Sequence, residues 1–220
     1  MKMKPFFFKT GILGVIILSL SACNGILEGI YDEPIEKESE FGFIEISEGD
    51  KTGMVYINAT SYTRWTYINF HTLTVDSMEI ADDAEEPDDW DIAIHRYDAK
   101  TNGGAVIETG FTGFEALQAS GKMPEGDYVQ DEWTTSQIII DMSGMMQGNI
   151  KYAESYYNSE LSKWLKVDTQ NMPPSYYPSN KVYVVKLKDG TFVALRLKKY
   201  MNASGDKGYM MIEYLYPFEI

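Results

Sequence analysis

Cysteine and histidine are the scarcest chemically active residues in this sequence. It contains one cysteine, Cys23, and two histidines, His71 and His95. A single cysteine excludes an intrachain disulfide, so the core alone must stabilise the fold. Zinc sites use several ligands in recognisable spacings, and neither His-Glu-x-x-His nor Cys-x-x-Cys occurs here. These absences argue against a zinc centre.

The sequence also lacks an apolar run long enough to cross a membrane. The run from Gly11 to Ala22 has 12 residues, whereas a helix needs about 20 to span a bilayer core of about 30 Å. Lysines precede this run, and the closing Leu20-Ser21-Ala22-Cys23 is similar to the bacterial lipobox, in which the cysteine is acylated and becomes the first mature residue. We therefore predict a signal peptide over residues 1–22 and lipidation of Cys23.

Positive charge is scarce as well. The chain has 19 Lys and Arg against 33 Asp and Glu, a net charge of −14. Such a surface repels phosphate backbones and anionic lipid headgroups, so we predict no nucleic-acid partner and membrane contact through the lipid alone. The acidic stretch that follows Cys23, with Pro34 and no sustained period, predicts a flexible tether over residues 23–40. Residues 41–220 are enough for a single domain.

The motifs of common enzyme classes are missing. There is no Gly-x-Ser-x-Gly elbow and no Gly-rich phosphate loop ending in Lys-Ser/Thr, and acylation of Cys23 leaves no thiol nucleophile. Among the 33 acidic residues no pair stands out as the paired carboxylates of a glycosidase. We therefore predict that the protein is not an enzyme.

From residue 41 onward the apolar residues mostly alternate with polar ones, which is typical of β-strands. Eight segments rich in Val, Ile, Thr and Tyr show this pattern: 42–47, 54–59, 64–75, 89–98, 137–142, 181–188, 191–200 and 209–218. Asp189-Gly190 separates two of them and is a strong hairpin signal. The C-terminal third is therefore expected to form an antiparallel meander.

One segment departs from the alternating pattern. Apolar side chains fall at i, i+4, i+7 and i+8 in Tyr157, Leu161, Trp164 and Leu165. This spacing predicts a short amphipathic helix between Ala153 and Leu165. The predicted fold class is therefore all-β, mostly antiparallel, with one or two short helices.

The acidic run Asp82–Asp91 is a candidate calcium site, since calcium takes carboxylate oxygens. It lacks the alternating Asp/Asn ligands, the central Gly and the closing Glu of an EF-hand loop, so a solvated loop is the better interpretation. His71 and His95 both lie in predicted strands. A histidine in such a place more often forms a structural hydrogen bond than a metal bond.

Methionine is concentrated in two loops. The loop at 141–149, DMSGMMQGN, contains Met142, Met145 and Met146. Methionine fills irregular gaps in cores, and its thioether is also a soft ligand that can bind haem iron axially; the composition leaves both open. In the second loop Met172 stands directly before Pro173-Pro174, which stiffen the backbone and give its side chain a fixed direction.

Aromatic residues are abundant, with 16 Tyr, ten Phe and four Trp. Several lie near the two methionine loops: Tyr156, Tyr157, Trp164, Tyr176 and Tyr177. Such rings can stack on a flat ligand, either a sugar face or a porphyrin, although many aromatics in strands serve only as core or surface residues.

Three stretches carry a resemblance to a known family. Trp90–Val106 (WDIAIHRYDAKTNGGAV), SYTRWTYINF at 61–70 and YMMIEYLYPF at 209–218 resemble the HmuY family of haem-binding lipoproteins from Bacteroidetes-type anaerobes. The similarity covers nearly all of the mature chain. It implies a mostly antiparallel β fold shaped like a hand, which grips one haem b between projecting loops. It also implies an outer-membrane, surface-exposed lipoprotein that passes haem to a TonB-dependent receptor for iron uptake.

The sequence departs from the family pattern at the iron. In the best-known form two histidines of two late loops ligate the haem, whereas no histidine follows His95 here. By spacing from Trp164 the second ligand falls near Thr169, three residues before Met172, and the first falls in or near the loop that contains Met145. Either the haem site has been lost in this chain, or methionine has replaced histidine at both positions. The presence of a methionine-bearing loop in each of the two required places favours replacement.

We predict from this that Met145 and Met172 are the axial ligands, with Met146 as the alternative to Met145. The tyrosines expected to contact the porphyrin are Tyr156, Tyr157 and Tyr176. Met142 is expected to end a strand, and His95 to be structural. The alternative function is a surface glycan-binding or adhesion lipoprotein without haem, in which exposed aromatics bind sugars and neither ligand methionine has a role.

Overall fold

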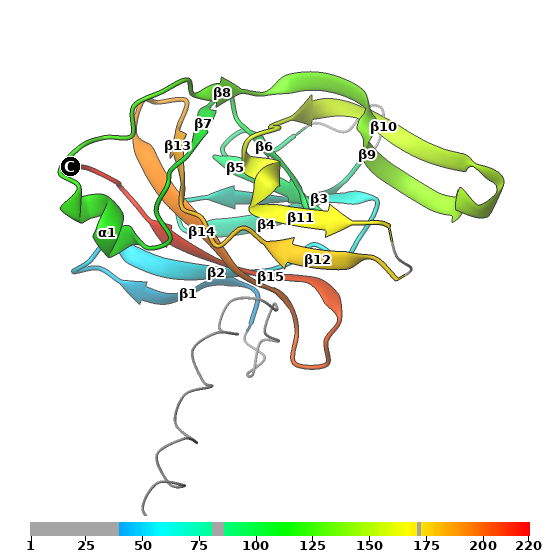
Figure 1. The fold of residues 1–220 in the computed structure, drawn as a ribbon, viewed down its shortest axis with the longest axis horizontal. Coiled ribbons are helices and arrows are strands. Elements are labelled where there is room, and N and C mark those ends of the chain that lie inside the picture. Colours follow the sequence, from blue (N-terminus) through cyan, green and yellow to red (C-terminus); the bar gives the residue numbers. More distant parts are fainter. Residues whose placement is uncertain (1–39, 81–85, 171–172) are drawn as a thin grey trace, which may run out of the picture. The chain divides into compact units, whose positions relative to one another are not determined.

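The computed structural model describes residues 40–80, 86–170 and 173–220 (Figure 1). The described residues all belong to one unit, Asp32–Ile220. The predicted signal peptide, Cys23 and nearly all of the predicted tether lie outside the described residues, as does Met172.

Two antiparallel sheets form the body of this unit. The larger has seven strands in the order β1 (Gly42–Ser47), β2 (Thr52–Asn58), β15 (Lys207–Leu215), β14 (Phe192–Met201), β13 (Tyr183–Lys186), β7 (Ala105–Glu108) and β8 (Val129–Gln130). The smaller has four, in the order β4 (Thr74–Glu79), β3 (Arg64–Asn69), β5 (Ile92–His95) and β6 (Asp98–Thr101).

Two further hairpins complete the fold. The first joins β9 (Glu132–Gly144) to β10 (Asn149–Tyr157) through a 3₁₀ turn at Met145–Gln147. The second joins β11 (Leu165–Asp168) to β12 (Ser175–Pro178) and is preceded by a 3₁₀ turn, η3, at Leu161–Trp164. The only α-helix in the described part of the chain is α1 (Phe114–Ala119).

The main core lies between the two sheets, where alternation directs apolar side chains inward. Ile57 and Ile212 of the larger sheet are fully buried there, as are Ile68, Ile92 and Ile94 of the smaller sheet. The other face of each sheet is also covered in part. Two smaller clusters of buried residues do this: Leu117 of α1 against Val184, Ala194 and Phe218, and Ile138 and Ala153 of the first hairpin against Trp65, Tyr67 and Trp90.

The predicted fold class is confirmed, and so is the C-terminal meander. β13 pairs with β14 across the Asp189-Gly190 turn, and β15 returns antiparallel beside β14. Within the described ranges no helix is long and apolar enough to span a membrane.

Two predicted strands are each divided by a tight turn. Residues 64–75 contain β3 and the start of β4, and residues 89–98 contain β5 and the start of β6. Leu73 (φ 54°) and Arg96 (φ 55°) adopt left-handed backbone conformations, which reverse the chain. Alternation continues on both sides of each turn, so the pattern alone does not reveal the reversal.

The helix predicted between Ala153 and Leu165 is wrong. Its first residues, Ala153 to Tyr157, are the end of β10 and pair with β9, and Leu165 begins β11. Only Leu161–Trp164 is helical, as one 3₁₀ turn. The i, i+3 spacing of Leu161 and Trp164 buries both on one face of such a turn, so the apolar pattern was real but belonged to a shorter element.

Candidate functional site

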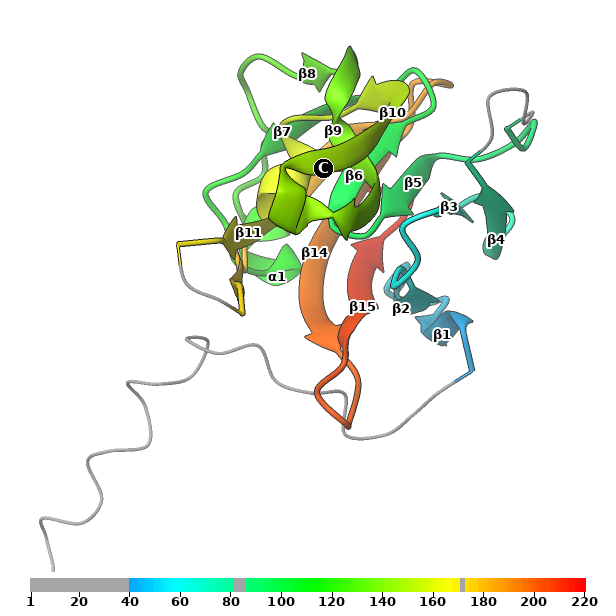
Figure 2. The ribbon, with the colours of Figure 1, turned by 90° about the vertical axis from the view of Figure 1, so that its right-hand side faces the viewer.

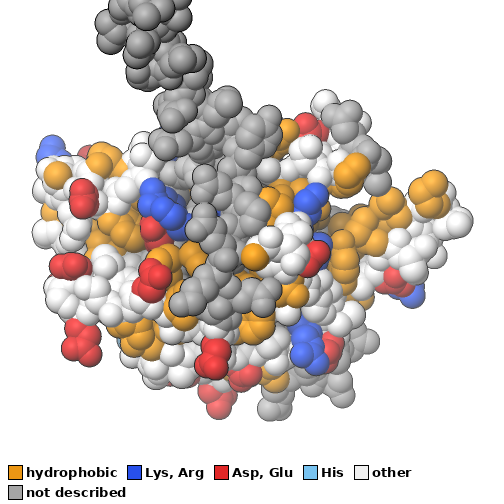
Figure 3. Space-filling view, turned by 90° about the horizontal axis from the view of Figure 1, so that it is seen from below, with side chains coloured by type: hydrophobic (Ala, Val, Ile, Leu, Met, Phe, Trp, Pro, Cys, Tyr) orange, Lys and Arg blue, Asp and Glu red, His pale blue; other side chains and the backbone are white. Residues whose placement is uncertain are grey.

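The two hairpins extend from the body in the same direction. They lie on the right in Figure 1 and point toward the viewer in Figure 2. In Figure 3 hydrophobic side chains are visible at this projecting end and also across the rest of the face. The predicted site residues Met145, Tyr156, Tyr157 and Tyr176 all belong to these hairpins.

The tip of the first hairpin is a tight, glycine-dependent turn. Gly148 follows the 3₁₀ turn with φ 75°, and its amide donates to the carbonyl of Met145 at 2.9 Å. A Cβ on Gly144 would lie 2.5 Å from the carbonyl oxygen of Asn149. Below the tip, Lys151 forms an ion pair with Asp141 at 3.2 Å. The backbone conformation of the tip is thus set by its own sequence.

The two adjacent methionines of this turn differ in environment. The side chain of Met146 is 86% exposed, whereas Met145 is half-buried. Met142 lies within β9, which continues two residues beyond it to Gly144. The tip therefore holds one exposed thioether and one that is half-buried.

The tyrosines of β10 point to opposite sides of the hairpin, as adjacent strand residues do. Tyr157 is half-buried and packs against the cluster beneath the hairpin. Tyr156 is 54% exposed and meets the ring of Trp133 edge-on at 5.2 Å, and Trp133 is itself 56% exposed. The two predicted tyrosine contacts thus lie on different faces.

Tyr176 of the second hairpin lies at the centre of an aromatic and cationic cluster. Its ring is 5.1 Å from that of Tyr200 and 6.3 Å from that of Tyr97. The Nζ of Lys207 lies 4.4 Å from the centre of the Tyr176 ring and donates to the carbonyl of Pro174 at 3.1 Å. Pro174 belongs to the loop that contains Met172.

The turn between β5 and β6 lies between the roots of the two hairpins. The Trp164 indole, just before β11, donates to the Tyr97 carbonyl at 3.4 Å. The backbone N–H of Asn158, just after β10, donates to the Ala99 carbonyl of β6 at 2.7 Å. This turn belongs to the WDIAIHRYD stretch, so the segment that carries the sequence resemblance forms the floor between the hairpins.

Polar contacts fix this floor. Arg96 donates through Nη1 to the Thr60 carbonyl at 2.5 Å, and its guanidinium lies 4.4 Å from the centre of the Tyr62 ring. His95 is 1% exposed, and its Nε2 lies 2.9 Å from the Tyr62 carbonyl oxygen. Burial raises the pKa of Tyr97 to about 12, so its hydroxyl stays neutral.

Sequence reasoning missed the residues that join the two hairpins at their roots. Asn158 is fully buried; its Nδ2 donates to Asp131 at 2.8 Å, just before β9, and its Oδ1 accepts from the Leu161 amide at 2.9 Å, at the start of η3. Asp131 also accepts from the Thr101 amide at 2.6 Å. Burial raises the pKa of Asp131, against the lowering effect of these hydrogen bonds. The bond from the Leu161 amide to Asn158 is local and of the capping type, for which asparagine is a preferred residue. No local signal marks the contact with Asp131, because it depends on the tertiary fold.

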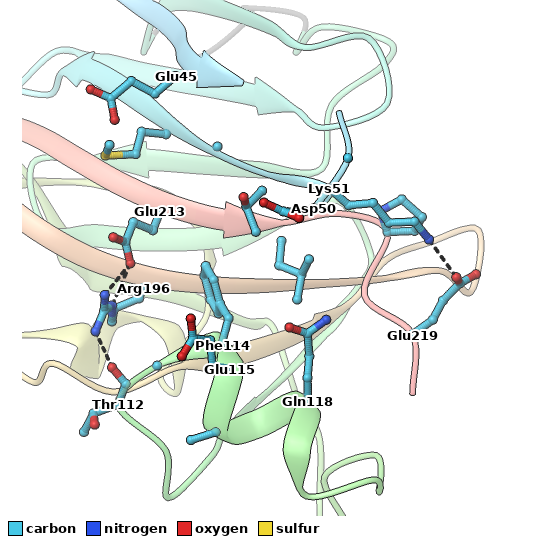
Figure 4. A pocket seen from close by; sticks show the side chains of 18 residues that line it. Glu45, Asp50, Lys51, Thr112, Phe114, Glu115, Gln118, Arg196, Glu213 and Glu219 are labelled. Carbon is cyan, nitrogen blue, oxygen red and sulfur yellow. Dashed lines mark hydrogen bonds and ion pairs between the residues drawn. The ribbon is translucent and has the colours of Figure 1, made fainter. Parts of the chain in front are cut away.

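Two clefts lie elsewhere on the described surface. The larger, about 1010 Å³, lies beside α1 and the β1–β2 turn (Figure 4). In it Arg196 bonds to both Glu213 and the Thr112 carbonyl, and Lys51 forms an ion pair with Glu219 at 2.9 Å. The smaller, about 360 Å³, contains His71, whose Nδ1 and Nε2 lie 3.3 Å from Asp91 and 3.0 Å from Asp189. Neither cleft is lined by a predicted site residue.

No group of three His, Cys, Asp or Glu side chains able to hold a metal ion occurs among the described residues. Part of the acidic run considered for calcium, residues 81–85, lies outside them. A thioether is not one of these groups, so the methionine prediction is independent of this finding.

Comparison with known proteins identifies the family. The model of the HmuY protein family matches residues 61–214. The chain belongs to the HmuY family. HmuY proteins are not enzymes, so the prediction that this chain has no catalytic function is confirmed by its family. A search of curated proteins finds no match.

Solved structures of HmuY relatives share the fold. A protein of Bacteroides vulgatus assigned as HmuY-like and haem-binding is 63% identical, with 82% of this chain and all of that chain covered and a TM-score of 0.78. A protein of Bacteroides fragilis assigned as a lipoprotein is 53% identical, with 84% and 100% covered and a TM-score of 0.80. The haem-free HmuY analogue of Tannerella forsythia is 26% identical, with 77% and 97% covered and a TM-score of 0.65.

Proposed function

We propose that this HmuY-family chain is a haem-binding lipoprotein. It holds haem b between the β9–β10 and β11–β12 hairpins, with Met145 and Met172 as axial ligands. One observation carries the proposal: the half-buried Met145 lies at the tip of one hairpin, and the loop that contains Met172 joins the strands of the other, which projects on the same side. Family membership and the relative assigned as haem-binding support the ligand.

The residues present suit the chemistry of the cargo. A thioether is a neutral, soft donor that binds haem iron and favours the ferrous over the ferric state. It does not titrate near neutral pH, unlike a histidine ligand. We therefore expect a raised reduction potential, tighter binding under reducing conditions and retention of haem at mildly acidic pH. Tyr176, half-buried in the second hairpin, is the best placed of the predicted tyrosines to contact the porphyrin.

The location and partners follow from the lipid anchor and the family. The signal over residues 1–22, acylation of Cys23 and the tether over residues 23–40 place the domain over residues 41–220 at the outer-membrane surface. The Bacteroides fragilis relative assigned as a lipoprotein supports the anchor. From there the protein delivers haem to a TonB-dependent receptor for iron acquisition.

An absorbance titration with haemin, in air and with dithionite, tests the ligands. It uses the mature chain with Cys23→Ser, so that no lipid is attached, and compares wild type with Met145→Ala and Met172→Ala. Wild type is expected to saturate near one equivalent with a six-coordinate low-spin ferrous spectrum, which each substitution abolishes. Met146→Ala is the matched control, because that side chain is 86% exposed, and it is expected to change little.

Two results would contradict the proposal. A spectrum no different from that of free haemin in either redox state would rule out haem binding. Loss of binding only in Met146→Ala would show that Met146, and not Met145, is the ligand.

The exposed pair of Trp133 and Tyr156 supports a second candidate, a glycan-binding lipoprotein, since sugar faces stack on such rings. In that case Trp133→Ala would abolish glycan binding, and Met145→Ala would not.

A further inference from the structure

Two cations in the described structure face aromatic rings and have no carboxylate partner. The chain has three arginines, of which Arg64 and Arg196 each form an ion pair with a glutamate. Arg96, by contrast, has no acidic side chain within ion-pair distance among the described residues, and neither does Lys207. The chain has 33 acidic residues, yet neither cation is neutralised by one of those described, so both positive charges are available to an anionic ligand.

Lys207 lies on the ring of Tyr176, and Arg96 adjoins Tyr97 in the same aromatic cluster. The Nζ of Lys207 is 4.4 Å from the centre of that ring, and the guanidinium of Arg96 rests on Tyr62 at 4.4 Å. The Tyr97 ring, next to Arg96 in the chain, lies 6.3 Å from the Tyr176 ring. Burial raises the pKa of Tyr176, and the positive charge of Arg96 opposes that rise. The cluster thus unites the loop before β3, the β5–β6 turn, β12 and the β14–β15 hairpin.

The position of Arg96 in its turn points to a role for the side chain. Arg96 and Tyr97 form the two-residue loop between β5 and β6, and only Arg96 has positive φ, at 55°. Glycine is favoured at the first position of such a loop, because a Cβ is strained there. The backbone alone therefore gives no reason for an arginine.

The guanidinium also has unused hydrogen-bonding capacity. It has five N–H donors; among the described residues Nη1 donates to the Thr60 carbonyl, and the buried Nε has no partner. The stacking on Tyr62 uses the face of the planar group; since Nε is buried, Nη2 and the second N–H of Nη1 are the donors left for a ligand. A guanidinium edge and an ammonium are the groups that bind carboxylates most strongly.

We propose that Arg96 and Lys207 form a carboxylate-binding subsite for the two propionate groups of haem. The inference rests on the proposed function and deepens it, since it assigns the polar edge of the porphyrin to the floor between the hairpins. Two cations match two carboxylates. The aromatic rings beneath the cations keep both in place before the ligand arrives, so little side-chain freedom is lost on binding.

Haemin and haemin dimethyl ester are the probes that test this subsite. The ester keeps the iron and the porphyrin faces and removes both carboxylate charges. The affinity of each probe is measured under dithionite for the mature Cys23→Ser chain and for its Arg96→Gln, Arg96→Lys and Lys207→Gln variants. Lys166→Gln is the matched control, because Lys166 is an exposed cation on β11 that pairs with Tyr177 and thus lies on the face of the hairpin opposite Tyr176.

The expected result is a specific loss for the free acid. Arg96→Gln and Lys207→Gln should each weaken haemin binding about tenfold or more, Arg96→Lys should retain part of the affinity, and Lys166→Gln should retain all of it. The ester should bind wild type more weakly than haemin does, and neither glutamine variant should weaken it further. Urea midpoints of the ligand-free variants establish that they are folded.

Other outcomes separate this inference from the proposed function. Equal losses for haemin and the ester in the glutamine variants would overturn the subsite and leave haem binding intact, since the cations would then act only on the fold. Unchanged haemin affinity in both glutamine variants would also overturn it. If wild type bound neither probe, the proposed function itself would fail, and the subsite with it.

Discussion

Replacing Trp164 by phenylalanine tests how the second hairpin is anchored. Trp164 is fully buried immediately before β11, and its indole donates to the Tyr97 carbonyl at 3.4 Å. Large aromatic side chains bury about 150–250 Å². Losing roughly 50 Å² of this between Trp and Phe corresponds to about 1.3 kcal/mol, and the unpaired carbonyl adds about 1 kcal/mol. We expect the free energy of unfolding to fall by about 2–3 kcal/mol.

Equilibrium unfolding in urea, followed by far-UV circular dichroism, measures this loss. Trp133→Phe is the matched control: the same chemical change is made on the first hairpin, at a side chain that is 56% exposed. It should alter the free energy of unfolding by no more than about 0.5 kcal/mol. Equal effects of the two substitutions would refute the reasoning, because burial would then not determine the cost.

Two further predictions concern stability. His71 is 37% exposed, and although burial alone would lower its pKa, contacts with Asp189 and Asp91 raise it. Wild type should therefore be more stable than His71→Gln by at most about 1 kcal/mol. This advantage should be full below about pH 6.5 and should disappear as the pH rises through the raised pKa of His71. Urea midpoints between about pH 5 and about pH 9 measure this, and an advantage that grew with pH would contradict it. A Cβ at Gly104 would lie 2.6 Å from the backbone oxygen of Lys186, so Gly104→Ala should lower the free energy of unfolding by about 1–3 kcal/mol. Gly110→Ala, where nothing lies within 4 Å, should not lower it, and equal urea midpoints for the two variants would show that the close approach does not matter.

The sequence was most informative where periodicity and turn chemistry agree. The alternating runs on both sides of Asp189-Gly190 predict β13, the turn and β14, and all three occur. Periodicity failed where the chain reverses without a glycine, as at Leu73 and Arg96. It also failed for Tyr157, Leu161 and Trp164, whose helical spacing spans the end of a strand and a single 3₁₀ turn.

The candidate site was predictable only in part. The two methionine loops were found because Met145 and Met172 stand in turn-forming sequences with little other apolar content, and Met145 indeed lies at the tip of a hairpin. The floor could not be derived from the residues, since Arg96 comes close to Tyr62 and Tyr176 only after three distant segments fold together. The same is true of the contact between Asp131 and Asn158, which lie 27 residues apart in sequence.

Asn158 has a consequence for ligand selection. Its side chain bonds to Asp131 at the start of one hairpin and to the Leu161 amide on the way to the other. This buried side chain therefore ties the start of one hairpin to the approach to the other. A ligand that pushed the two roots apart would have to break the bonds of Asn158. A residue that need not touch the ligand thus restricts how far the hairpins can separate.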